Sequence, residues 1–148
     1  MEKPLAENKK AYFNYEILKT IEAGIELRGF EVKAIKSGFA SLTGAYATIK
    51  GGELWLTNTQ IPPYQKNNVP KEYNPLRPRR LLVKKSELLE LVGRMSGERL
   101  TLIPLKLYTK GPRVKVLLGL VRGKREHEKR DVLRKRAVTR EIQRTLRK

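Results

Sequence analysis

The last 27 residues of the chain are so rich in charge that they restrict where a folded core can lie. Residues 122–148 contain twelve Lys or Arg, four Asp or Glu and few apolar residues. On a helix, Arg136, Arg140 and Arg144 would form a row of like charges beside a narrow apolar stripe. So thin a stripe does not repay an ordering cost of roughly 1–2 kcal/mol per residue. We therefore expect residues 122–148 to be disordered when free and helical on a polyanion, with a fixed, solvated surface helix as the alternative.

The remaining residues, 1–121, are enough for one domain, and they are basic as well. The whole chain of 148 residues carries 33 Lys or Arg against 15 Asp or Glu, a net charge of +18. Such a charge favours nucleic acid, an anionic membrane or an acidic protein as the partner. No apolar run reaches the ~18 residues of a membrane span, the N-terminus lacks the apolar core of a signal peptide, and there is no cysteine. We expect a cytoplasmic, monomeric protein with no membrane partner.

Several later segments have the pattern of β-strands joined by tight turns. Two apolar runs on either side of Gly51-Gly52 predict a hairpin. Residues 99–109 and 113–121 predict two further strands joined around Gly111-Pro112. Prolines recur without any period between residues 62 and 78, which predicts a long surface loop.

A short strand and a helix are predicted after this loop. Residues 81–83 suit a strand, and Ser86 is a good N-cap for a helix that ends at Gly97. The helix is expected to bury one face, made of Leu88, Leu89, Leu91, Val92 and Met95.

The N-terminal part of the chain has a mixed pattern. Residues 11–15 are β-like, whereas apolar residues recur four apart over 17–25 and predict a helix that stops at Gly29. Residues 30–34 alternate between apolar and charged, which predicts a half-buried strand. With about six strands and two inserted helices, we predict a mainly β fold. The favoured form is an antiparallel barrel of the oligonucleotide-binding (OB) kind with flanking helices, and a two-layer α+β sandwich is the alternative.

Basic residues stand beside aromatic ones near the N-terminus, a combination typical of RNA binding. In the sequence NKKAYFNY, Asn8, Lys9 and Lys10 precede three aromatic residues. Cations can meet phosphates there, and rings can stack on bases or face the core. In the sequence NPLRPRR, Arg77 and Arg79 offer planar donors for phosphate, or belong to a solvated loop.

Three single residues raise separate questions. Glu31 lies in a basic stretch, where its carboxylate either accepts hydrogen bonds from a base edge or a 2′-hydroxyl, or pairs with a neighbouring Lys. His127, the only histidine, either stacks on an exposed RNA base or has no special role. Trp55 stands between two leucines and is expected in the core. With one His and no Cys, we expect no metal site, no cofactor and no enzyme activity.

Five stretches resemble one protein family: NKKAYFNYEI, GIELRGFEVKAIKSG, NPLRPRRLLVKKSEL, PLKLYTKGPRVKVLLGLVRGKREHEKRD and REIQRTLRK. In this order they run over about residues 8–148, and they resemble the SsrA-binding proteins, the family also called small protein B. The resemblance implies a bacterial cytoplasmic protein, not an enzyme, that binds the tRNA-like domain of transfer-messenger RNA (tmRNA). It implies a role in trans-translation, the rescue of ribosomes stalled on mRNA that lacks a usable stop codon. It also implies an OB-type barrel and a tail that becomes helical on the ribosome.

The resemblance implies roles for individual residues as well. The tRNA-like domain would be held by Asn8, Lys9, Lys10, Gly29, Glu31, Lys33, Lys124 and Arg125, and we add Arg77 and Arg79 to this set. In the small-subunit decoding centre, His127 would stack on a ribosomal RNA base, followed by Lys129 and Arg130. The empty mRNA channel would be lined by Arg136, Arg140 and Arg144. The chain departs from the family pattern at Ala34, Arg125 and Glu128, where the family commonly has Ser, Lys and Asp.

Two other functions compete on the residues alone. A general RNA- or DNA-binding protein would have the same charge without a preference for a tRNA-like fold. An RNA-cleaving or RNA-modifying enzyme would need clustered acids with a metal or a Gly-rich cofactor loop, and the sequence has neither pattern.

Overall fold

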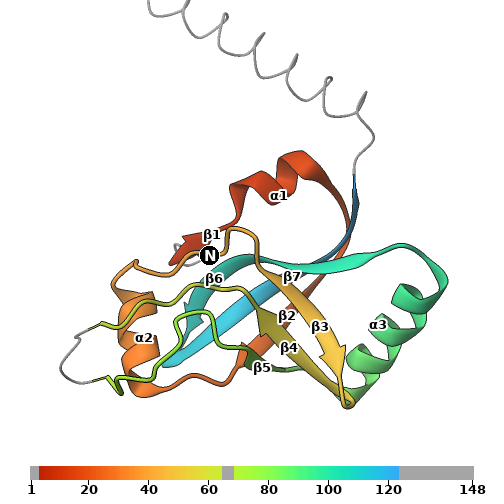
Figure 1. Ribbon diagram of the computed structural model, residues 1–148. Coiled ribbons are helices and arrows are strands. Elements are labelled where there is room, and N and C mark those ends of the chain that lie inside the picture. The colour runs from red at the N-terminus through yellow and green to blue at the C-terminus, as the bar shows by residue number, and fades with distance from the viewer. Residues whose placement is uncertain (1–3, 65–68, 124–148) are drawn as a thin grey trace, which may run out of the picture.

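The computed structural model describes residues 4–64 and 69–123, and its strands pair into a closed ring (Figure 1). The strands are β1 (Ala6–Glu7), β2 (Tyr15–Ile25), β3 (Tyr46–Lys50), β4 (Glu53–Thr57), β5 (Arg79–Leu82), β6 (Thr101–Lys110) and β7 (Arg113–Gly123). The helices are α1 (Lys9–Asn14), α2 (Gly29–Lys36) and α3 (Lys85–Gly97). Antiparallel pairing runs from β6 through β3, β4, β5, β2 and β7 back to β6, and β1 pairs with β6. The prediction of a mainly β fold with flanking helices is confirmed.

The inner face of the ring holds the main core. Along β7, Val114, Val116, Leu118 and Leu120 are buried at alternate positions, as expected for one face of a strand. Helix α2 adds Ala34 and Ile35 to this core, and α3 adds Leu91. Figure 1 shows α2 and α3 on opposite sides of the strands, so apolar groups from both helices help to close the interior.

A second, smaller core lies where α1 packs on β6 and β7. It is made of Ala11, Ile103, Leu105 and Val121. Because neighbouring strand residues point to opposite faces, Leu102 enters the main core while Ile103 points to the α1 side. This packing fixes α1 against the ring.

The two predicted hairpins are confirmed. β3 and β4 pair from Tyr46↔Thr57 to Lys50↔Glu53 around Gly51 and Gly52. Both glycines have positive φ, 62° and 74°, which glycine adopts without the steric cost that other residues bear. β6 and β7 pair around Gly111, whose φ is also positive.

The predicted order of strand and helix at the N-terminus is wrong. Residues 9–14 form helix α1, and residues 15–25 form the long strand β2. A spacing of four fits a strand as well as a helix, because four is a multiple of the strand period of two. The ladder with β7 decides the outcome, since β2 pairs with it from Tyr15↔Gly123 to Gly24↔Lys115.

The strand predicted over residues 30–34 is a helix as well, and Gly29 begins it rather than ending another. The buried positions of α2 are Glu31, Ala34 and Ile35, which have the helical spacing i, i+3 and i+4. The alternation of apolar and charged residues predicted a strand because Glu31, a charged residue, occupies one of the buried positions of the helix.

Two details of the later segments also differ from prediction. Helix α3 begins at Lys85, with Lys84 as its N-cap rather than the expected Ser86. Of the expected apolar face only Leu91 is fully buried, and Leu89 is 62% exposed. Trp55 lies outside the core, because Leu54 and Leu56 take the inward positions of β4 and leave it on the opposite face.

Gly119 lets β7 approach Leu105 closely, and this gives a test of the second core. A Cβ at Gly119 would lie 2.9 Å from Leu105 Cδ1, and Leu105 is 1% exposed. Because a buried leucine has little room to move, we expect Gly119→Ala to lower the free energy of unfolding by about 1–3 kcal/mol in urea denaturation. Gly93→Ala in α3, where nothing lies within 4 Å, should instead raise it by up to about 1 kcal/mol. Equal effects of the two variants would contradict this packing.

Candidate nucleic-acid interface

The start of α1 presents two lysines to solvent from a firmly held backbone. The Asn8 backbone N–H donates to Leu105 O at 2.8 Å, and its side-chain Nδ2 donates to Pro104 O at 3.2 Å. Three residues on, Ala11 is buried in the second core. Lys9 and Lys10 lie between these two anchors and are exposed. The predicted cation pair therefore faces solvent from a helix that is anchored on both sides.

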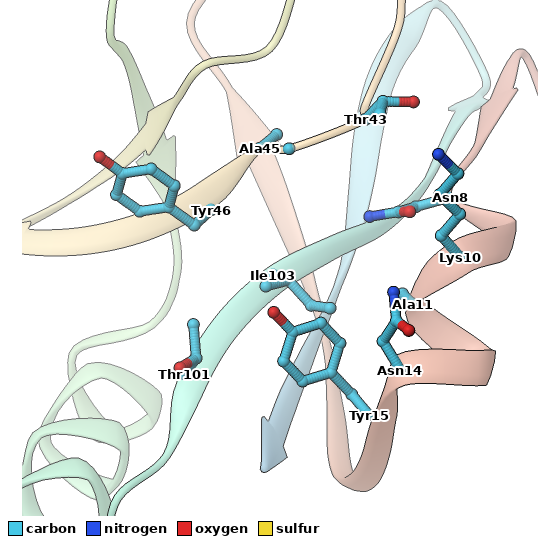
Figure 2. Close-up of a pocket in the computed structure, with 11 residues that line it drawn as sticks. Asn8, Lys10, Ala11, Asn14, Tyr15, Thr43, Ala45, Tyr46, Thr101 and Ile103 are labelled. Carbon is cyan, nitrogen blue, oxygen red and sulfur yellow. The ribbon is translucent and has the colours of Figure 1, made fainter. Parts of the chain in front are cut away.

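A cavity of about 300 Å³ lies beside these lysines, between α1, β3 and β6 (Figure 2). Figure 2 shows the Tyr15 ring beside Ile103, and the Tyr46 ring across the cavity on the β3 side. The apolar part of the lining is Ala11, Ala45 and Ile103. The polar and aromatic part is Asn8, Lys10, Asn14, Tyr15, Thr43, Tyr46 and Thr101, with Gly44 in the loop.

One side-chain amide of this cavity is open to a ligand. The described residues offer no hydrogen bond to the side-chain amide of Asn14, which carries both donors and an acceptor. Lys10 supplies a positive charge at the same edge. Aromatic rings, an amide and an ammonium group together suit a nucleotide, whose base stacks and whose phosphate is anionic.

A second set of predicted residues converges on Glu31 in α2. The Glu31 side chain is 0% exposed, and its Oε1 accepts hydrogen bonds from the Arg28 backbone N–H at 2.8 Å and from Arg77. Its Oε2 accepts from Arg79 Nε at 2.7 Å and lies 3.0 Å from the Tyr73 hydroxyl. Glu31 therefore forms an ion pair as expected, but its partners are two arginines of the distant NPLRPRR stretch rather than a neighbouring Lys. A direct contact of Glu31 with RNA does not fit its burial.

Arg79 is part of the same buried network rather than of the surface. Its side chain is 0% exposed, and its Nη1 donates to Thr59 O at 2.6 Å. Its Nη2 donates to Pro75 O at 3.0 Å and to the Tyr73 hydroxyl at 2.8 Å. The expected phosphate contact of Arg79 is therefore wrong for this conformation, since every guanidinium nitrogen is used inside the protein.

Arg77, Gly29 and Lys33 keep access to solvent around this network. The Arg77 side chain is 25% exposed while it pairs with Glu31, so it can contact a second anion from its outer side. Gly29 and Lys33 are exposed on α2. Phe30 packs edge-on against Tyr73, with ring centroids 4.7 Å apart, and so adds a second tie between α2 and the loop.

The network shifts the pKa of two of its members. Burial alone would raise the pKa of Glu31, but hydrogen bonds from Arg77, the Arg28 backbone and Arg79 outweigh it and lower the pKa. Burial raises the pKa of Tyr73, and the Glu31 carboxylate adds to this shift. Glu31 is therefore charged and Tyr73 neutral at physiological pH.

The remaining predicted residues lie outside the described part of the chain. They are Lys124, Arg125, His127, Lys129, Arg130, Arg136, Arg140 and Arg144, and the predicted disorder of residues 122–148 falls there too, apart from Arg122 and Gly123 at the end of β7. Within the described ranges, no helix is long and apolar enough to cross a membrane. Residues 4–64 and 69–123 also contain no group of three His, Asp or Glu that could hold a metal ion.

Sequence reasoning missed the cavity because its walls come from distant segments. Tyr15 was part of the aromatic pattern beside the lysines, but Thr43, Tyr46 and Thr101 carried no signal. Only the pairing of β3 with β6, at Ala47↔Leu102, brings those residues next to α1.

Removing the charge of Glu31 should destabilise the fold. Glu31→Gln keeps the size of the side chain but leaves the buried Arg79 without a counter-charge. We expect the free energy of unfolding to fall by about 3–5 kcal/mol in urea denaturation. Glu90→Gln, which breaks the exposed pair with Lys19, should leave the unfolding midpoint unchanged. A similar small effect for both variants would rule out the network as a structural tie.

The same group should make stability depend on acid pH. Because the pKa of Glu31 is lower in the folded than in the unfolded state, the unfolded chain binds more protons at low pH. The contribution of Glu31 is complete above its ordinary value of 4.5 and is lost as pH falls through the folded pKa. Between about pH 5 and pH 3, the wild-type protein should lose stability more steeply than Glu31→Gln. Parallel pH profiles of the two proteins would contradict this.

The chain is similar to known proteins over nearly its whole length. The family model described as SmpB protein matches residues 5–148. A protein of Thermosynechococcus vestitus named SsrA-binding protein is 48% identical, over 97% of this chain and 95% of its own. A protein of the same name from Carboxydothermus hydrogenoformans is also 48% identical, over 99% of this chain and 98% of its own.

A solved structure is similar as well. It is described as "tmRNA-SmpB: a journey to the center of the bacterial ribosome" and is 44% identical. The match has a TM-score of 0.67 and covers 86% of this chain and 93% of the other. The family match, the two relatives and the shared fold lead to one conclusion: the chain belongs to the SmpB family.

Proposed function

We propose that the protein binds the tRNA-like domain of tmRNA and delivers it to stalled ribosomes in trans-translation. The observation that carries this proposal is the exposed Lys9-Lys10 pair, anchored on β6 and open beside a cavity suited to a nucleotide. Membership of a family whose relatives are named SsrA-binding proteins supports the choice of RNA.

The barrel would hold the RNA at two places. At α1, Lys9 and Lys10 meet phosphates, while Asn8 positions them through its bonds to β6. At α2, Lys33 and the outer side of Arg77 meet the backbone, and Gly29 lets RNA approach closely because it has no side chain. In this scheme Glu31 and Arg79 act as positioning residues, since both are buried.

The tail would act in the ribosome rather than on the tRNA-like domain. We propose that residues 1–121 form the RNA-binding domain, extended by the last residues of β7, and that residues 122–148 enter the decoding centre. His127 would stack on an exposed rRNA base there, with Lys129 and Arg130 on phosphates beside it. Lys124 and Arg125 would complete the tmRNA site at the junction. The row Arg136, Arg140 and Arg144 would occupy the mRNA channel only where no mRNA competes for it.

This function is binding without catalysis. We infer that the protein is a monomeric adaptor that acts in the cytoplasm, where ribosomes translate, and that it needs no cofactor. The similar solved structure concerns tmRNA-SmpB and the bacterial ribosome, which supports both partners.

Binding to the isolated tRNA-like domain tests the proposal. The full chain and a truncation ending at Gly123 are compared at moderate salt, with ordinary tRNA and duplex DNA as competitors. We expect the truncated protein to keep tight, selective binding. If neither protein prefers the tRNA-like domain, a general basic RNA-binding protein becomes the better assignment.

The Lys9-Lys10 pair should account for part of the salt dependence of binding. Replacing both by alanine should weaken binding to the tRNA-like domain and reduce the slope of log K against log salt by about 0.7–0.9 for each phosphate that the variant no longer neutralises. The matched control is the double alanine variant of Lys84 and Lys85, another exposed pair at a helix start. If the control lowers the slope as much, the positive charge acts through the whole surface and α1 does not bind the phosphates itself.

A further inference from the structure

The outer face of the β3–β4–β5 sheet presents the only tryptophan of the chain. In the pairing, Trp55 lies opposite Thr48 of β3 and opposite Arg80 of β5. Because Leu54 and Leu56 point into the core, Trp55 is left half-buried on the outer side. Burial of the tryptophan inside the ring was expected, so its outward position needs another explanation.

The ring of Trp55 lines a hollow rather than a flat sheet. This Trp55 groove has a volume of about 620 Å³ and is lined by Tyr46, Thr48, Lys50, Gly51, Glu53, Trp55, Thr57 and Pro78. Tyr46, which is 38% exposed, also lines the cavity beside α1. Tyr46 is therefore shared by the two hollows, and Figure 2 shows its ring on the β3 side of the cavity that Lys10 and Asn14 also line.

The chemistry of the Trp55 groove suits unpaired bases more than a protein partner. Apart from Tyr46, Trp55 and Pro78, its walls are threonines, a glycine and charged groups, so it lacks the apolar centre of a protein interface. Lys50 adds a cation at one end. Arg80 adds another next to Trp55, oriented by Glu53 at 3.3 Å and Glu26 at 3.5 Å. Aromatic rings flanked by cations are the usual means of holding single-stranded RNA.

We propose that the Trp55 groove is a stacking surface for unpaired bases of the RNA whose phosphates α1 holds. The inference rests on the proposed function for the identity of that RNA, which is the tRNA-like domain of tmRNA. One base lies over the ring of Tyr46, which lines both hollows, and the next lies on Trp55. The backbone between them runs toward Lys50 and Arg80.

Trp55 itself reports the result, because no other residue contributes tryptophan fluorescence. The full chain is titrated with the isolated tRNA-like domain, with single-stranded oligoadenylate and with duplex RNA of the same length. Stacking should quench the emission with the first two RNAs. The duplex should leave it unchanged, because its bases are already stacked on one another.

Substitutions separate stacking from charge. Tyr46→Ala should weaken binding of the tRNA-like domain by about five-fold to a hundred-fold, the usual range when one base loses its stacking partner. Tyr64→Ala is the matched control, since Tyr64 is 39% exposed and lines neither hollow. Thr48→Glu places a carboxylate opposite Trp55 without removing a ring, and should weaken binding as well. Thermal melting of each variant verifies that the fold is retained.

The outcomes distinguish this inference from the proposed function. If the tRNA-like domain binds tightly with unchanged emission, and Tyr46→Ala behaves like Tyr64→Ala, the stacking surface is overturned and the proposed function stands. If the protein does not prefer the tRNA-like domain over ordinary tRNA, the proposed function fails. The titration with oligoadenylate then tests the stacking surface by itself. Quenching by oligoadenylate then supports a stacking surface for unpaired bases, and constant emission overturns it.

Discussion

The ion pairs of the buried Glu31 carboxylate with Arg77 and Arg79 are the interaction on which the position of α2 against the start of β5 depends. It joins α2 to residues 73–79, which lead into the start of β5. A buried ion pair adds little net stability over a well-packed apolar cluster, because desolvating the charges costs about as much as their attraction returns. Its benefit lies in geometry, because the carboxylate oxygens accept and the guanidinium nitrogens donate hydrogen bonds only in certain directions. The network therefore holds residues 73–79 against α2 in one arrangement.

The ring of strands separates stability from binding. Closing the pairing from β6 back to β6 satisfies backbone hydrogen bonds along the ring and places one set of side chains in the core. The side chains on the outer face of the strands are then available for binding. Helix α1 covers part of the outer face of β6 and β7, and it displays Lys9 and Lys10 from that support. The outer face of β3 and β4 carries Tyr46 and Trp55, which the core does not need.

Electrostatics explains why so basic a chain can fold and still bind RNA. Several surface cations are paired with acids across strands, among them Lys110 with Glu22 and Arg122 with Glu16. These exposed pairs reduce repulsion in the barrel but contribute little stability each. Among the described residues, no salt bridge involves Lys9, Lys10 or Lys33, so their charge is available to phosphate.

The sequence by itself determined the features that depend on neighbouring residues. Gly51-Gly52 and Gly111 produced the two hairpins because their positive φ is a local property, and the charge of the chain indicated a polyanion as partner. Only the tertiary structure decided whether residues 15–25 became strand or helix. Apolar residues four apart fit both, and the pairing of β2 with β7 makes the segment a strand. It also decided that Arg79 is buried while Arg77 reaches solvent, and that Trp55 faces outward, since burial depends on which segments, distant along the chain, pack together.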